Sequence, residues 1–201
     1  MNETFAIAIA FLVMLNPFAM FVFLEPLRRN MEGLLFKKML LKATLNSAAI
    51  FVFFYLAGDF LFASVLRIHF DAFRIFGGII IFSFAYIFII RGRKTLIQEK
   101  QNINDLAMDV SIPFMVGAGT VSLSILLGQT SPHPVLGTLL IFLILTINYL
   151  LILGLGYTRL LFIRRPDYFD RCMDTIMRIN IFLIGAIGVD MAMTGLSNLL
   201  G

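Results

Sequence analysis

Six long apolar segments constrain this chain more than any other feature of its sequence. They cover residues 4–26, 43–63, 73–90, 110–128, 135–157 and 177–200. An α-helix needs roughly 20 apolar residues to cross about 30 Å of hydrocarbon, and each segment approaches or exceeds that length. Of the 201 residues, 60% are hydrophobic and 14% are charged, which excludes an ordinary soluble domain and a disordered chain. The sequence therefore predicts an all-α membrane protein with six transmembrane helices, in a single membrane domain over residues 1–201.

Basic residues are concentrated in alternate connections between these segments. Fourteen of the 16 lie in or beside the connections after segments one, three and five, at positions 28, 29, 37, 38, 42, 91, 93, 94, 100, 159, 164, 165, 171 and 178. Because cytoplasmic loops carry an excess of Lys and Arg, both termini are predicted to lie outside, in a multi-pass protein of the plasma or inner membrane. We interpret the net charge of +4 as a topology signal with lipid contacts, and expect no nucleic-acid binding.

The two halves of the chain contain matching short strings. TLN at 44–46 recurs as TIN at 146–148, which is 102 residues later, and RI at 74–75 recurs at 178–179, which is 104 residues later. With three helices per half, the second copy must enter the membrane from the opposite side. We therefore predict two inverted repeats, residues 1–100 and 101–201, an arrangement found in many secondary transporters.

The first apolar segment is interrupted at its centre by Asn16 and Pro17. Pro17 has no N–H and its ring crowds the carbonyl of Val13, so the helix must bend or unwind there, and Asn16 can act as the N-cap of the helix that follows. The matching position in the second half falls on Ala118 and Gly119, in the fourth segment. We therefore predict that helices one and four are both broken near the midplane, where transporters place their sites.

These breaks predict a substrate-binding site. The half-helix ends would expose N–H groups on one side and carbonyls on the other, which suits a zwitterion. Residues two apart lie roughly 200° apart around a helix, so at most one of Thr44 and Asn46 faces the site, and we favour the asparagines. The candidate substrate-binding residues are Asn16, Pro17, Gly117, Ala118, Gly119, Thr120, Asn46 and Asn148. Two alternatives stay open: kinks that only shape packing, and side chains that only bond neighbouring helices or their own backbone.

Asp190 is the ionisable residue well inside the sixth segment. A charged Asp at the bilayer centre costs about 2.5 to 3.5 kcal/mol, so we expect it to face a cavity. Burial favours the uncharged carboxyl group, which makes Asp190 a candidate for proton coupling. The alternative is a neutral Asp that is hydrogen-bonded to a neighbouring helix. No cofactor and no metal site are expected, because His69 and His133 fall in predicted loops without further ligands.

Several strings taken together resemble the MarC family. They are NP at 16–17, AFRI at 72–75 with GG at 77–78, IP at 112–113 with Gly117 and Gly119, and RI at 178–179. The resemblance covers essentially the whole chain and implies a six-helix inner-membrane protein; family members of the SnatA type are regarded as transporters of small neutral amino acids. The chain departs from the family where Phe18, Ala19 and Met20 follow the NP pair, where Ala118 replaces a proline, and where Asp190 lies near the usual position of a glutamine.

We therefore predict a secondary transporter of small solutes such as glycine or alanine, either coupled to protons through Asp190 or uncoupled. Phe18 and Met20 could line the site and favour a larger apolar solute instead. A LysE-type exporter and a non-transporting six-helix membrane subunit are the alternatives. An enzyme is not expected, because the sequence contains no HExxH motif and its histidines lie in loops. The expected partners are a small-molecule substrate and the lipid bilayer, and small residues such as Gly185 and Gly188 would also permit a homo-oligomer.

Overall fold

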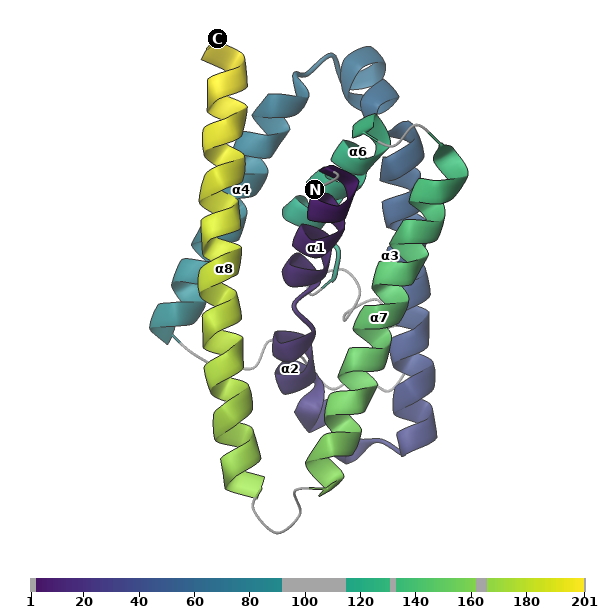
Figure 1. The fold of residues 1–201 in the computed structure, drawn as a ribbon, viewed down its shortest axis with the longest axis vertical. Helices are drawn as coiled ribbons and strands as arrows, with labels where there is room; N and C mark the ends of the chain where they lie inside the picture. Colours follow the sequence, from purple (N-terminus) through teal and green to yellow (C-terminus); the bar gives the residue numbers. More distant parts are fainter. Residues whose placement is uncertain (1–2, 92–114, 131–132, 162–165, 201) are drawn as a thin grey trace.

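Helices make up every regular element in the part of the chain that the computed structural model describes, which is residues 3–91, 115–130, 133–161 and 166–200 (Figure 1). The elements are α1 (Glu3–Leu15), α2 (Pro17–Asn30), α3 (Gly33–Phe60), the π-helix η1 (Leu61–Leu66), α4 (Phe70–Arg91), α6 (Ala118–Thr130), α7 (Pro134–Leu161) and α8 (Pro166–Leu200).

Five of these stretches are long and apolar enough to cross a membrane: Thr4–Glu25, Gly33–Gly58, Phe70–Ile90, Pro134–Arg159 and Arg171–Leu200. The first of them comprises α1 and most of α2. The prediction of a helical membrane protein is confirmed. Of the predicted fourth segment, residues 110–114 lie outside the described residues, residues 115–117 precede α6, and α6 forms the rest.

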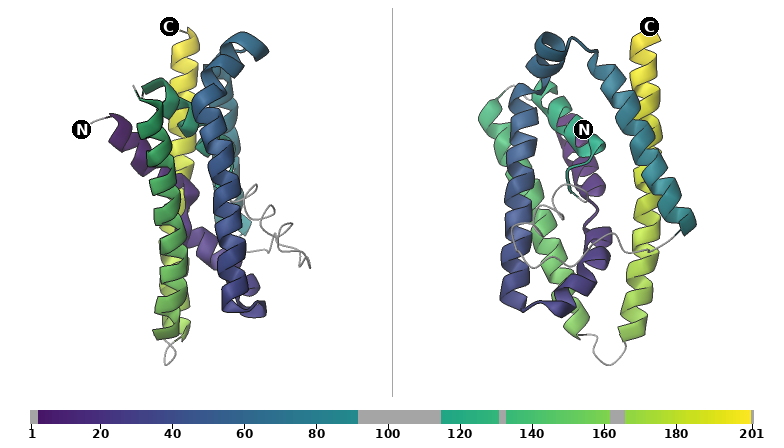
Figure 2. Two further views of the ribbon diagram at one scale, coloured as in Figure 1. Left: turned by 90° about the vertical axis from the view of Figure 1, so that its right-hand side faces the viewer. Right: turned by 180° about the vertical axis from the view of Figure 1, so that it is seen from behind.

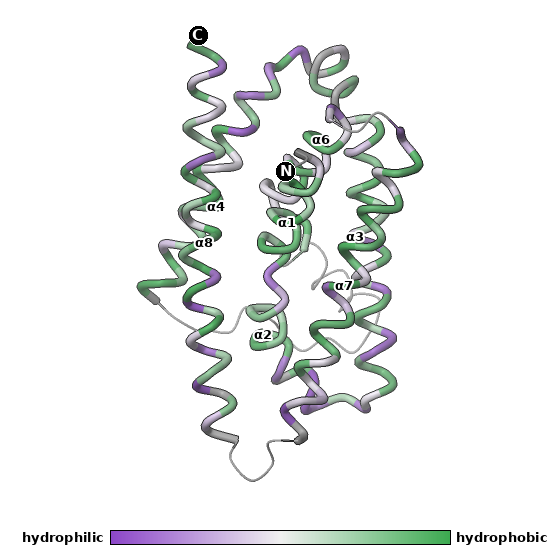
Figure 3. The backbone as a smooth tube through the Cα atoms, viewed as in Figure 1, coloured by the Kyte–Doolittle hydropathy of each residue, from purple (hydrophilic) through white to green (hydrophobic). Residues whose placement is uncertain are grey.

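The two ends of the described chain lie toward the same end of the molecule (Figure 1). The opposite end of the molecule contains the connection between α2 and α3, the last residues of α7 and the first residues of α8. Hydrophilic residues are frequent at this end (Figure 3). Arg28, Arg29, Arg159 and Arg171 belong to this end. The basic positions 93, 94, 100, 164 and 165 lie outside the described residues. Which of the two ends faces the cytoplasm stays a prediction.

The helices α4 and α8 form an antiparallel pair with the most extensive contact between any two described helices (Figure 2). Two glycines permit this close approach. A methyl group on Gly78 would collide with the backbone oxygen of Gly188, and a methyl group on Gly188 would lie 2.8 Å from the backbone nitrogen of Phe82. Small residues at such positions let two helix backbones touch, which is how membrane helices gain packing energy.

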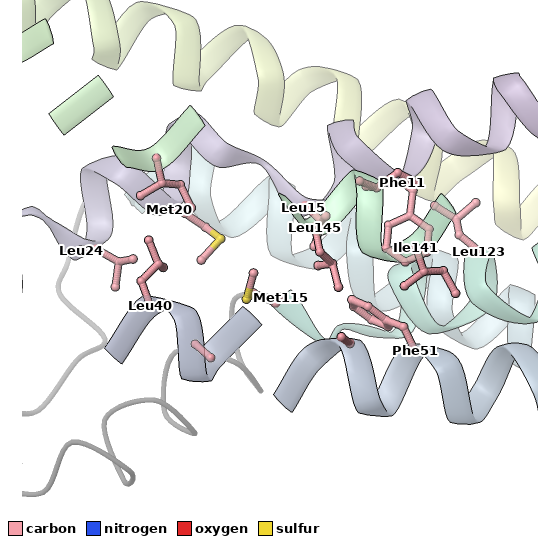
Figure 4. Packing of buried hydrophobic residues seen from close by; sticks show 14 of the residues in the cluster. Phe11, Leu15, Met20, Leu24, Leu40, Phe51, Met115, Leu123, Ile141 and Leu145 are labelled. Atoms are coloured by element: carbon pink, nitrogen blue, oxygen red, sulfur yellow. The ribbon is translucent and has the colours of Figure 1, made fainter. Parts of the chain in front are cut away.

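The remaining helices share one apolar core. Phe11 of α1 packs edge-on against Phe51 of α3, with ring centroids 5.0 Å apart, and Met20, Leu145 and Leu123 belong to the same cluster (Figure 4). The short helices α1, α2 and α6 lie between the long helices: α6 packs against α3 and α4, and α1 and α2 pack against α7 and α8. The broken segment is thereby held at the centre of the bundle.

Candidate functional site

Asn16 separates α1 from α2 and adopts a left-handed conformation, with φ 48° and ψ 67°. Asparagine tolerates this conformation better than most residues with a Cβ. Its Oδ1 accepts a hydrogen bond from the Ala19 N–H at 3.0 Å, and its own N–H donates to the carbonyls of Leu12 and Val13 at 3.3 and 3.1 Å. Pro17 is the first residue of α2, where its missing N–H costs nothing. The predicted break and N-cap are confirmed.

The break leaves carbonyls at the end of α1 without their usual helical partners. Val13 O also accepts from Nδ2 of Asn180, a buried residue of α8, at 3.5 Å. The carbonyls of Met14 and Leu15 receive no backbone N–H from the described part of the chain. Asn180 was not among the predicted site residues, although an asparagine inside a spanning segment commonly bonds a backbone group that has lost its helical partner.

A second helix end lies at Gly117, immediately before α6. The Gly117 N–H donates to Thr120 Oγ1 at 2.9 Å, and this hydroxyl lies 2.9 Å from the Met115 carbonyl, to which it donates. The first regular bond of α6 runs to the Gly117 carbonyl. The N–H groups of Ala118, Gly119 and Thr120 precede that bond and find no acceptor among the described residues. The Thr120 hydroxyl therefore shapes the backbone, and the free N–H groups form an electropositive helix end.

The two glycines of this segment are not needed for an unusual backbone conformation, because neither has a left-handed φ. A methyl group on Gly119 would collide with the side chains of Met14 and Ile81, so glycine is needed there for close packing. A methyl group on Gly117 would meet nothing within 4 Å. The left-handed residue at the two breaks is Asn16.

A pocket of about 160 Å³ lies where these helix ends meet. It is lined by Met14, Leu15, Asn16, Ala19, Met20, Phe23, Ile80, Ile81, Phe84, Met115, Gly117, Gly119, Thr120 and Ile184. The predicted residues Asn16, Gly117, Gly119 and Thr120 are thus brought together. None of the described residues that line the pocket has a charged side chain, and their polar groups are backbone groups, one amide and one hydroxyl.

On α3 the structure contradicts the expected orientation. Asn46 is exposed, whereas Thr44 and Ser47 are buried. The Thr44 hydroxyl donates to the Leu40 carbonyl at 2.8 Å. The expectation that Asn46 faces inward is therefore wrong, because the face of α3 that packs in the bundle is the one carrying Thr44 and Ser47.

On α7 the expected orientation is confirmed, since Asn148 is completely buried. Its Nδ2 lies 3.8 Å from the sulfur of Met20, and its Oδ1 has no hydrogen-bond partner in the described residues. Ser47 of α3 makes the corresponding contact to Met115 Sδ at 3.3 Å. Asn148 and Ser47 thus each contact a methionine that lines the pocket. Asn148 itself lies behind Met20 and does not line the pocket.

Asp190 is exposed and does not line the pocket. It lies two positions after Gly188, which packs on α4, and therefore roughly 200° around α8 from that contact. The expectation that Asp190 faces a cavity is wrong for this arrangement of helices. Its part in proton coupling stays a prediction.

A cluster of ion pairs ties α2 to α7 at the arginine-rich end. Glu25 accepts from Arg28 Nε at 2.8 Å and from Arg29 Nε at 2.9 Å, and it also pairs with Arg159 of α7. Burial lowers the pKa of the Arg28 guanidinium, and the positive charge of Arg29 lowers it further. The Glu25 carboxylate is what makes this concentration of positive charge tolerable.

Comparisons with known proteins agree with this architecture. Residues 1–200 match the family described as MarC family integral membrane proteins. A UPF0056 membrane protein of Pyrococcus horikoshii is 26% identical over 204 residues, which covers 97% of this chain and 94% of the relative. No solved structure matches the chain. Since the family match extends over nearly the whole sequence, the chain belongs to the MarC family of integral membrane proteins.

Proposed function

We propose that the protein is a secondary transporter that binds a neutral amino acid, as a zwitterion, at the junction of α1, α2 and α6. The observation that carries this proposal is the pocket of about 160 Å³ at that junction. The N–H groups of Gly119 and Thr120, which have no acceptor among the described residues, offer donors for a carboxylate, and the carbonyl of Met14 offers an acceptor for an ammonium group. The described lining residues carry no charge, which favours a solute without net charge.

Inverted repeats, the usual framework of such transporters, are supported by the helix boundaries. The first residues of α2 and α6, Pro17 and Ala118, are 101 residues apart. The same offset separates Gly33 from Pro134 and Phe60 from Leu161, so α3 and α7 match at both ends. Packing follows the same rule, because α6 contacts α3 and α4 as α1 and α2 contact α7 and α8.

Burial supports the proposed repeat and favours a slightly different register. The buried residues of α7 lie 101 positions after buried residues of α3: the α7 positions are 137, 141, 144, 145, 148, 152 and 156. The buried positions 77, 78, 81 and 85 of α4 correspond at an offset of 103 to 180, 181, 184 and 188 of α8. We therefore propose offsets of 101 and 103, each one residue shorter than the offsets of 102 and 104 from the sequence strings. In the new register Ser47 corresponds to Asn148, and Asn16 to Gly117.

Uptake of labelled glycine and alanine into proteoliposomes tests the proposal. The diagnostic variant is Gly117→Ala, because Gly117 lines the pocket beside the helix end proposed to hold the carboxylate, and a methyl group there meets no described atom within 4 Å. We expect uptake to fall at least tenfold with unchanged folding. Gly154→Ala on α7, where a methyl group also meets nothing within 4 Å, is the matched control and should transport normally.

Two outcomes would contradict the proposal. If neither glycine and alanine nor a larger neutral amino acid enters with wild type or control, with the folded protein verified in the vesicles, the protein would be a non-transporting membrane subunit. Normal uptake by the Gly117→Ala variant would show that the substrate does not bind at this helix end. Proton coupling is tested separately: if Asp190 carries the proton, accumulation driven by an imposed pH gradient should be lost in the Asp190→Asn variant, while counterflow without a gradient should persist.

A further inference from the structure

We infer that the site selects amino acids with large apolar side chains, such as leucine, methionine or phenylalanine, over glycine and alanine. This inference rests on the proposed function and narrows its substrate class. It follows from three properties of the pocket: its volume, the direction in which it extends from the helix ends, and the flexibility of its walls.

The volume exceeds what the smallest amino acids need. A cavity of about 150 Å³ lined by apolar side chains is large enough to take up benzene. The pocket at the helix ends has a similar volume of about 160 Å³ and is not fully enclosed, so an aromatic ring or a branched aliphatic side chain can occupy it while the charged groups of the solute lie at the helix ends. Glycine or alanine bound by its charged groups would leave most of that space unfilled, and unfilled apolar space loses dispersion contacts.

The pocket extends away from the helix ends along an apolar path. Its lining continues down α2 to Phe23 and along α4 from Ile80 to Phe84. Phe23 follows Asn16 by seven residues, which corresponds to about 10 Å along a helix. A solute whose charged groups occupy the end near Gly117 would direct its side chain along this path, between Phe23 and Phe84. Polar groups of the lining gather at the opposite end, so the path favours an apolar side chain.

Three methionines give the pocket a wall that can adapt to different side chains. Met14, Met20 and Met115 all line it. Methionine is unbranched and flexible, and it is used where one surface must accept several apolar shapes. Asn148 and Ser47 contact the sulfurs of Met20 and Met115 from the sides of α7 and α3. The wall is therefore suited to a class of apolar side chains rather than to a single one.

The test compares the concentrations at which unlabelled glycine, alanine, leucine and phenylalanine half-saturate counterflow in proteoliposomes of the full chain. Leucine should act at a concentration about 50-fold lower than alanine, which is the change expected from burying three more carbons. The variant that narrows the path is Ile80→Phe, at a lining position that is 43% exposed and so can accept a larger group. This variant should raise the half-saturating concentration about tenfold for leucine and less than twofold for alanine.

Ile87→Phe is the matched control, since Ile87 lies on the same helix, is 51% exposed and does not line the pocket. It should transport like the wild type. Two results would overturn the inference while leaving the proposed function in place. One is a half-saturating concentration of leucine less than about fivefold below that of alanine. The other is an Ile80→Phe variant that raises the half-saturating concentrations of both solutes equally. If none of the four amino acids exchanges in wild type or control, the proposed function itself fails, and the two failures are thus distinguished.

Discussion

Replacing Asn16 separates the two tasks that this residue performs at the helix break. Asn16→Gly removes the hydrogen bond to the Ala19 N–H but keeps the left-handed conformation accessible. An uncapped N–H at a buried position costs roughly 1 to 3 kcal/mol. Asn16→Ala removes the same bond and also forces an alanine into the left-handed region, which costs about 1 to 2 kcal/mol more. The difference between the two variants therefore isolates the backbone conformation.

The free energies of unfolding can be measured for wild type and both variants by denaturant titration in mixed micelles, with helix content as the signal. We expect the order wild type, Asn16→Gly, Asn16→Ala, with the last two separated by about 1 to 2 kcal/mol. Equal stability of the two variants would show that position 16 is not left-handed in the folded protein. A glycine variant as stable as wild type would show instead that the bond to Ala19 contributes nothing.

Three further changes test contacts that hold the bundle together. Glu25→Gln removes the carboxylate that pairs with three arginines and should lower the free energy of unfolding by about 2 kcal/mol or more, whereas Arg29→Gln, at a side chain 61% exposed, should cost less than about 1 kcal/mol. Gly78→Ala drives a methyl group into the backbone of α8 and should cost about 1 to 3 kcal/mol in the same titration, with Gly33→Ala, at an open position, as the control near zero. Asn180→Ala should cost about 1 kcal/mol through the lost bond to the end of α1, and an unchanged midpoint would contradict that bond.

The features that could be predicted from the sequence have local causes. Pro17 cannot continue a helix and Asn16 can cap one, so the break and its position follow from two residues. The number of apolar residues in a segment likewise fixes whether it can cross a bilayer. These predictions needed no knowledge of which helices are neighbours.

The orientation of the helices about their own axes could not be predicted in the same way. In water, an apolar stripe marks the buried face of a helix, but in a membrane the lipid-facing side is apolar as well. Leu45 and Leu41 of α3 are exposed, whereas Ala43 and Thr44 are buried. Hydrophobicity therefore gave no indication that Asn46 faces outward. The expectation that Asp190 faces a cavity failed for a related reason. The rule that charged residues in membrane helices face cavities does not specify which helices lie next to them.

The packing also bears on which parts of the protein move if the proposed transport occurs. Rocking of two intact repeats would separate α4 from α8, since one belongs to each repeat, and these two helices share the most extensive contact in the described structure. Gly78 and Gly188 bring their backbones together, which makes separation costly. The pocket has Ile81 and Ile184 of this pair on one side and the helix ends at Asn16 and Gly117 on the other. Movement of the α4–α8 pair as a unit against the remaining helices would open the pocket and keep both the α4–α8 contact and the core around Phe11 and Phe51 intact. It would separate the apolar contacts that α2 makes with this pair, such as that of Phe21 with Phe169, but these are less extensive than the α4–α8 contact, so the packing favours that movement over rocking of the repeats.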